Sequence, residues 1–302
     1  MSAWVALTIA GAFLQNLRSL MQRRLTSDLS VNGAAYVRFL YALPFAWLFL
    51  WAFRQGVGPA SLPELNGDFW LFVSAGAITQ IIATSALVAA VSGSHFALGT
   101  ALSKTEAVQA VLLGLLILGE GVGYLAFGGI TVSLLGVFLL SGNILPGDLV
   151  RSDRRVWFGL LAGTALALCS ICYRGASLSL LGVDAVSASA RATAGAAAYT
   201  LAVAVSMQSV VMGIYLRLLE PGQLTLVLKH WRPAVVVGLV AMLASACWFT
   251  AMAMHNAAMV RALGQVELLF TLATSIWLLG ERITRREVLG IGLLVLGILM
   301  LF

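Results

Sequence analysis

The chain has 302 residues, of which 61% are hydrophobic and only 10% are charged, with a mean hydropathy of +0.98. Soluble domains average about 25% charged residues, so these side chains are too few to cover a soluble fold. The composition excludes a soluble enzyme, a nucleic-acid binder and a disordered chain, and it predicts an all-α membrane protein. In such a protein the net charge of +6 reports orientation rather than an anionic partner.

A membrane-spanning helix needs about 20 apolar residues, and glycine, proline and charged residues divide this chain into ten such stretches. We predict them at 3–25, 32–53, 68–91, 95–118, 122–142, 155–178, 185–216, 232–254, 257–279 and 285–302. The first stretch lacks the basic start of a signal peptide and ends in Arg23-Arg24, so we expect a retained helix. Pro44 should kink the second stretch. The seventh looks long enough to continue beyond the membrane.

The two halves of the chain repeat each other. At an offset of 161 residues Glu106 aligns with Glu267, and Leu118-Gly119-Glu120 aligns with Leu279-Gly280-Glu281. Residues 1–142 and 155–302 therefore form two five-span repeats joined by a linker at 143–154. Because five is odd, the second copy must run through the membrane upside down. Such inverted repeats are typical of secondary transporters, which bind substrate near the midplane between the halves.

Glycines in the last span of each repeat follow the same offset, with Gly129 and Gly136 aligning with Gly290 and Gly297. They predict close helix packing, either within one chain or across a homodimer. The pair Gly159-x-x-x-Gly163 predicts a similar approach for the sixth span.

The repeat resembles the EamA domain of the drug/metabolite transporter superfamily. The residues that carry the resemblance run from Lys104-Thr105-Glu106 to Leu118-Gly119-Glu120 and from Gln265-Val266-Glu267 to Leu279-Gly280-Glu281. It implies a ten-helix permease with a central cavity, lined by helices one to four and six to nine. Many members carry proline after the mid-helix glutamate, where this chain has Ala107 and Leu268. We therefore expect these two helices to be straighter than is usual in the family.

Basic residues predict the orientation. One set of connections holds eleven lysines and arginines: Arg23, Arg24, Arg151, Arg154, Arg155, Arg217, Lys229, Arg232, Arg282, Arg285 and Arg286. The opposite set holds only Arg54 and Arg174. The positive-inside rule places the first set in the cytoplasm, so both termini would face outward. We expect a multi-pass protein of a bacterial-type plasma membrane, in contact with the lipid bilayer.

Charged residues inside the spans are the candidate functional residues, because each costs at least a few kcal/mol at membrane depth. Glu106 and Glu267 lie near the centres of the fourth and ninth spans. Each could contact a substrate amine or carry a proton, or it could neutralise an arginine and hold helices together. Lys104 aligns with Gln265, so the halves differ in charge there, which would orient a substrate with one charged end.

Four further residues are singled out. Asn16 and Gln80 are polar side chains in spans expected to line the cavity. Arg38 and Arg191 align at an offset of 153 and lie about six residues into their helices. Inversion would place them near opposite membrane faces, as paired gates, although each could instead snorkel to its interface.

No G-x-x-x-x-G-K-[ST] motif is present, so an ion gradient or the substrate's own gradient must drive transport. We expect an exporter of a small polar metabolite, such as an amino acid or an amino-acid-derived compound that includes metal chelators. A lipophilic-cation drug exporter and a sugar-phosphate or nucleotide-sugar carrier are the alternatives. We predict no cofactor and no metal site. An intramembrane enzyme is disfavoured, because the spans contain no histidine-rich or paired-aspartate constellation.

Overall fold

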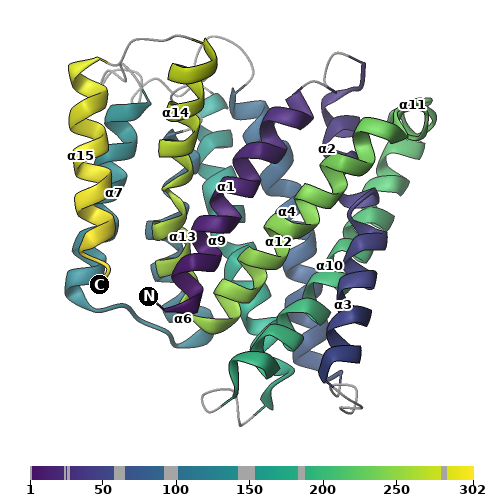
Figure 1. Cartoon of the computed structure of the whole chain (residues 1–302), viewed down its shortest axis with the longest axis horizontal. Helices are drawn as coiled ribbons and strands as arrows, with labels where there is room; N and C mark the ends of the chain where they lie inside the picture. Colours follow the sequence, from purple (N-terminus) through teal and green to yellow (C-terminus); the bar gives the residue numbers. More distant parts are fainter. Residues whose placement is uncertain are drawn as a thin grey trace. The chain divides into compact units, whose positions relative to one another are not determined.

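The computed structural model describes residues 2–23, 25, 28–57, 65–91, 101–141, 154–182, 188–279 and 284–302, which form helices and turns without a strand (Figure 1). The all-α prediction is confirmed for this part of the chain. Arg24, Arg151, Arg282 and Glu281, and all but the last residue of the predicted linker, lie outside the described residues.

Seven helical stretches in the described part are long and apolar enough to cross a membrane. They are Val31–Gln55, Gly67–Leu87, Ala101–Leu118, Trp157–Ser179, Ala190–Leu219, Trp231–Met254 and Ala257–Thr274. Tyr124–Leu140 is a shorter apolar helix. The stretch expected to be long is a 30-residue helix, α10 (Ala190–Leu219).

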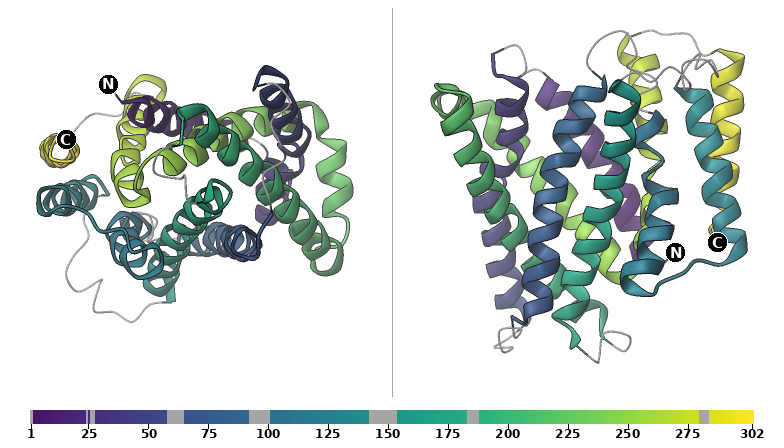
Figure 2. Two further views of the ribbon diagram at one scale, coloured as in Figure 1. Left: turned by 90° about the horizontal axis from the view of Figure 1, so that it is seen from below. Right: turned by 180° about the vertical axis from the view of Figure 1, so that it is seen from behind.

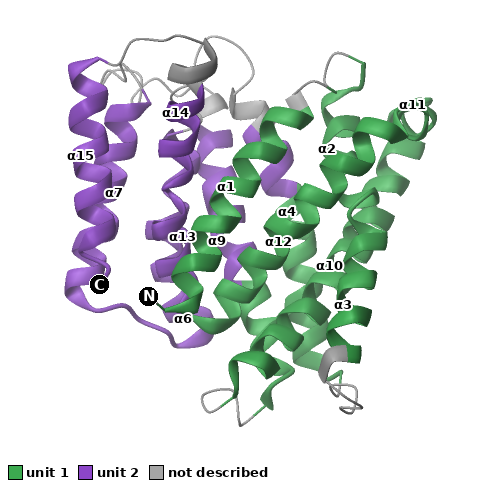
Figure 3. Cartoon of the chain, viewed as in Figure 1, with its two compact units in different colours: residues 1–81, 172–255 green, residues 82–171, 256–302 purple. Residues whose placement is uncertain are grey.

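The chain divides into two compact units, and each takes segments from both halves of the sequence (Figure 3). Unit 1 comprises residues 1–81 and 172–255, and unit 2 comprises residues 82–171 and 256–302. The division falls inside two helices, α4 (Gly67–Val91) and α9 (Arg154–Ser179). Neither repeat is therefore a compact body by itself, because part of each is packed with part of the other.

Unit 1 contains α1 (Ala3–Arg23), α2 (Val31–Leu40), α3 (Leu43–Val57), α10, α11 (Gln223–Lys229) and α12 (Trp231–Met254), with the start of α4 and the end of α9. Helix α1 packs along α12, and Figures 1 and 2 both show the two side by side. Gly11 permits this approach, since a Cβ there would lie 3.2 Å from Cys247 Cβ and 3.4 Å from the Trp248 ring. Helix α10 packs against α2, α3 and α12.

The kink predicted at Pro44 is confirmed as a break between α2 and α3. Helix α2 ends at Leu40, the chain turns at Tyr41 and Ala42, and α3 begins at Leu43. Proline has no N–H for the carbonyl four residues earlier, which is that of Leu40. The regular pattern resumes when the Ala46 N–H donates to the Ala42 carbonyl.

Arg174 of α9 caps the end of α12. Its Nη1 donates to the carbonyls of Met252 at 2.7 Å, Ala253 at 3.3 Å and His255 at 2.8 Å. The last carbonyls of a helix have no partner within it and carry its negative dipole end. A guanidinium there satisfies them, so this arginine has a structural use in unit 1.

Unit 2 contains α6 (Glu106–Leu118), α7 (Tyr124–Leu140), α13 (Ala257–Gly264), α14 (Glu267–Leu279) and α15 (Arg285–Leu299), with the end of α4 and the start of α9. Helices α7 and α15 lie side by side in both Figures 1 and 2. A Cβ on Gly129 would lie 2.6 Å from the Gly297 carbonyl oxygen, and one on Gly136 would lie 2.6 Å from the Gly290 carbonyl oxygen. The predicted glycine contact is therefore made within one chain, and this pairing shows that the helices run antiparallel.

Candidate functional site

Two breaks in the spans of unit 2 position the predicted glutamates. Helix α6 begins at Glu106 after a turn at Lys104-Thr105, and α14 begins at Glu267 after a turn at Gln265-Val266. Both spans are interrupted although neither has a proline there. The glutamates lie in the first turns of these helices, where the dipole favours negative charge.

The two breaks have the same hydrogen bonds at repeat-related positions. The Lys104 N–H donates to Ala101 and the Thr105 N–H to Leu102, at 3.1 and 3.2 Å. At an offset of 161, the N–H groups of 265 and 266 donate to the carbonyls of 262 and 263, at 3.2 and 3.1 Å. These three-residue spacings replace the four-residue spacing of an α-helix, so the backbone tightens at the same place in both halves.

Helix α9 packs closely against the first break. A Cβ on Gly163 would lie 3.0 Å from Thr105 Oγ1 and 3.1 Å from the carbonyl oxygens of Leu102 and Ser103. Thr105 Oγ1 itself donates to the Leu102 carbonyl at 2.6 Å. The close approach expected from Gly159-x-x-x-Gly163 therefore occurs at Gly163, beside the candidate site.

The breaks bring four charged side chains together as two ion pairs. Lys104 Nζ lies 3.3 Å from Glu267 Oε2, with 17% and 16% of the two side chains exposed. Arg261 Nη1 lies 3.8 Å from Glu106 Oε2, with 10% and 6% exposed. Each pair joins a residue of the first half of the chain to one of the second half. The cluster therefore contains two cations and two carboxylates, and its net charge is zero.

The two pairs are not equivalent. Lys104 donates a hydrogen bond to Glu267. The 3.8 Å between Arg261 Nη1 and Glu106 Oε2 is too long for a hydrogen bond. Glu106 Oε2 is accordingly buried without a hydrogen-bond partner among the described residues. Arg261 is held elsewhere as well, since its Nε donates to Ser170 Oγ at 2.5 Å. A buried acceptor without a donor is costly, so Glu106 Oε2 is available to a new donor.

Gln265 joins the same cluster. It is almost completely buried, and its Nε2 donates to the Lys104 carbonyl at 3.4 Å. Its Oε1 has no hydrogen-bond partner in the described part of the chain. The structure thus brings together Lys104, Glu106, Gln265 and Glu267, all four of which were predicted, and it adds Arg261.

A second polar cluster lies in unit 1 around Gln80. Tyr173 Oη donates to Gln80 Oε1 at 2.8 Å, and Gln208 Nε2 donates to the same oxygen at 2.5 Å and to Tyr173 Oη at 2.9 Å. The Phe249 ring stacks on Tyr173 with centroids 4.2 Å apart. Sequence reasoning selected Gln80 and missed its two partners. Gln208 carried a usable signal, because it is an amide within the apolar middle of α10.

The other predicted site residues also lie in unit 1. Asn16 is buried in α1, and Arg38 is half-buried in the last turn of α2, with its guanidinium 4.9 Å from the centre of the Phe39 ring. Arg191 is exposed in the first turn of α10. These three residues and Gln80 belong to a different unit from the four charged side chains.

Comparison with known proteins gives a family and a fold. A model of the EamA-like transporter family matches two stretches of the chain, residues 2–142 and 156–302. No curated protein matches the chain. Among solved structures 28 chains match. One, described only as a crystal structure of a protein, has a TM-score of 0.72 at 16% identity, over 99% of this chain and 97% of its own. At that identity the likeness shows a shared fold.

Proposed function

Because the chain belongs to the EamA-like transporter family, we propose that it is a secondary transporter that exports a small polar metabolite, an amino acid or an amino-acid-derived compound. Membership makes it a multi-pass membrane protein of a family of transporters rather than enzymes. The proposed architecture is ten spanning helices in two inverted five-helix repeats, set in a plasma membrane with the basic connections in the cytoplasm.

The inverted arrangement is supported by repeat-related elements. Helices α7 and α15 are the last spans of the two repeats, and their glycine contacts require them to run antiparallel. Equivalent helices run in opposite directions when one repeat is upside down relative to the other. The matching breaks before Glu106 and Glu267 support the duplication on which this arrangement depends.

The observation that carries the substrate class is the unpartnered Glu106 oxygen beside paired cations. A substrate ammonium would supply the donor that Glu106 Oε2 lacks. Lys104 and Arg261, each already facing a carboxylate, are the groups able to receive a substrate carboxylate. A zwitterion satisfies both needs, whereas a lipophilic cation offers no carboxylate to either of these cations. A proton on Glu106 or Glu267 is the proposed coupling species.

The remaining predicted residues are proposed to act along the pathway. Asn16 and Gln80 supply buried polar groups in unit 1. Arg38 and Arg191 are proposed as closing contacts at opposite faces. In that case Arg38→Ala and Arg191→Ala would shift the accessibility of cavity cysteines in opposite directions. A shift in the same direction in both, or none, would leave interfacial snorkelling as their role.

Counterflow of labelled amino acids in proteoliposomes, with and without a pH gradient, tests the proposal. Glu106→Gln should abolish uptake or its dependence on the gradient while the purified protein remains monodisperse. Glu287→Gln is the matched control, because Glu287 sits in an exposed capping box with Thr284 and glutamine serves equally well in such a box. Wild-type uptake by Glu106→Gln would refute the site. Counterflow of a lipophilic cation or a sugar phosphate, with none of any amino acid or amino-acid-derived compound, would refute the substrate class.

A further inference from the structure

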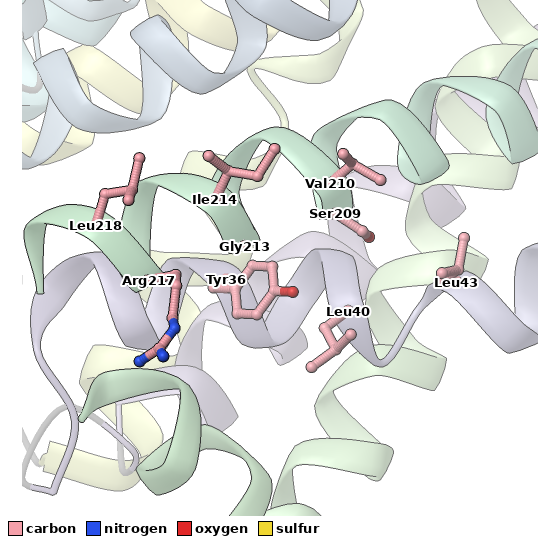
Figure 4. A pocket seen from close by; sticks show the side chains of 9 residues that line it. All are labelled: Tyr36, Leu40, Leu43, Ser209, Val210, Gly213, Ile214, Arg217 and Leu218. Carbon is pink, nitrogen blue, oxygen red and sulfur yellow. The ribbon is translucent and has the colours of Figure 1, made fainter. Parts of the chain in front are cut away.

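An open groove of about 600 Å³ runs along the outer face of α10 in unit 1 (Figure 4). Its wall is almost entirely apolar. Val210, Ile214 and Leu218 line it from α10, and Leu40 and Leu43 line it from either side of the break between α2 and α3. The figure shows Arg217 and Leu218 at one end and Leu43 at the other.

Two local features create the groove. The chain turns at Tyr41 and Ala42, between Leu40 and Leu43, which line the groove. Gly213 adds depth, because it has no side chain and a Cβ there would lie 2.8 Å from Tyr36 Oη.

With α10 placed across a bilayer, the groove would reach from the headgroups to the acyl chains. Helix α10 has 30 residues, so it is about 45 Å long, whereas the hydrocarbon core is about 30 Å thick. With α10 centred in the bilayer, the Cα of Arg217 lies about 19 Å from the midplane, at the headgroups. Ile214 lies about 14 Å and Val210 about 8 Å from the midplane, beside the acyl chains.

Arg217 lies at the headgroup end of the groove, and its positive charge favours an anionic ligand. The described part of the chain offers the Arg217 guanidinium no hydrogen bond or ion pair. Glu220, one turn further along, is already engaged, because its two oxygens accept from Ser30 Oγ at 2.5 Å and Asn32 Nδ2 at 2.6 Å. A phosphate fits a guanidinium with two parallel hydrogen bonds.

We propose that this groove binds an anionic glycerophospholipid, with its phosphate on Arg217 and one acyl chain along Ile214 and Val210 toward Leu43. The lipid would lie across the break between α2 and α3 and would brace it against α10. The proposal uses the orientation in which Arg217 faces the cytoplasm, where the leaflet is anionic. It does not depend on the transported substrate.

Native mass spectrometry of the full chain tests the proposal. Protein in detergent is titrated with phosphatidylglycerol or with phosphatidylcholine of the same acyl chains. Wild type should bind phosphatidylglycerol about fivefold more tightly, the factor that corresponds to about 1 kcal/mol per basic residue at an anionic surface. Arg217→Gln should remove this preference, and Arg232→Gln, a cation outside the groove that faces the Trp231 ring, should keep it.

A second variant tests the acyl-chain part. Ile214→Trp should fill the groove and reduce binding of both lipids at least fivefold, while Leu219→Trp, exposed on the same helix but outside the groove, should leave it unchanged. Val210→Trp replaces Ile214→Trp if that variant does not fold. The readout is independent of transport and of orientation, so its failure would not be confused with failure of the proposed function.

Three results would overturn the proposal. The first is an unchanged phosphatidylglycerol preference in Arg217→Gln. The second is displacement of the lipid by inorganic phosphate at millimolar concentration, which would show an anion site without an acyl chain. The third concerns Ser209, whose hydroxyl is buried in the groove without a hydrogen-bond partner in the described chain. An acyl chain offers it none, so Ser209→Ala should bind normally, and weaker binding would indicate a different ligand with a polar group at that depth.

Discussion

Replacing Glu267 with glutamine distinguishes an ion pair that holds helices together from one that also serves transport. The Lys104 Nζ to Glu267 Oε2 distance is 3.3 Å, at which two unit charges attract by about 5 kcal/mol with an effective dielectric constant of 20. Removing one partner of a buried pair typically costs about 3–5 kcal/mol, because the other charge stays desolvated. Both side chains keep about a sixth of their surface exposed, so we expect Glu267→Gln to lose about 3 kcal/mol, the low end of that range.

The double variant Lys104→Met with Glu267→Gln removes both charges and separates the two roles. With no unpaired charge left, the free energy of unfolding should return to within about 1 kcal/mol of wild type. Denaturant unfolding in detergent measures the stability of wild type, Glu267→Gln and the double variant. Counterflow in proteoliposomes measures their transport, which we expect to be lost in both variants.

Two outcomes would refute this reasoning. If the double variant regains both stability and transport, the pair is structural and Lys104 and Glu267 have no part in binding or coupling. If Glu267→Gln is as stable as wild type, the remaining Lys104 charge is not desolvated, and the burial argument itself fails. Glu287→Gln, which removes a carboxylate outside the cluster, shows what a generic loss of negative charge does in both assays.

Three other predictions follow from packing, capping and charge. Gly297→Ala should destabilise the protein by about 1–3 kcal/mol, because the added Cβ would meet backbone atoms of α7. Gly292→Ala is the control and should be neutral or slightly stabilising, because no atom lies within 4 Å of its Cβ. Denaturant unfolding measures both. Arg174→Gln should lose about 2 kcal/mol by removing a charged donor from three carbonyls, visible as faster hydrogen exchange at the end of α12. A phosphatase fused after Phe302 should be active and a green fluorescent protein fused there dark; the reverse would overturn the orientation and leave the fold intact.

Much of the helical pattern could be predicted because spanning helices are specified by apolar length alone, which a linear scan detects. The break at Pro44 was predictable too, since proline removes a backbone donor at a known position. The breaks before Glu106 and Glu267 were not, because Lys104-Thr105 and Gln265-Val266 contain neither proline nor glycine. At the break before Glu106, Gly163 of α9 packs closely against Thr105, and the Thr105 hydroxyl donates to the Leu102 carbonyl. A hydropathy pattern contains no information about either contact.

The candidate site shows the same limit. Charged residues at membrane depth are conspicuous in sequence, so Lys104, Glu106 and Glu267 were found from their cost alone. Arg261 was harder, because it lies near the start of its span, where snorkelling is an equally good reading, and only the fold brings it to Glu106. Tyr173 could not have been selected, since a tyrosine in an apolar span is ordinary until its hydroxyl is seen to meet Gln80 and Gln208.

The asymmetry of the two ion pairs follows from one substitution within the repeat. Perfect symmetry would pair the lysine of each half with the glutamate of the other, but the mate of Lys104 is the uncharged Gln265. The cation for Glu106 comes instead from Arg261, four residues or about one helical turn earlier, and it reaches only to 3.8 Å. Glu267 is thus held by a hydrogen bond, whereas Glu106 has a buried oxygen without one. The duplicated repeats supply two similar carboxylates, and the displaced cation leaves Glu267 hydrogen-bonded and one Glu106 oxygen without a donor. Under the proposed function, this difference would let the site bind a substrate in a single orientation.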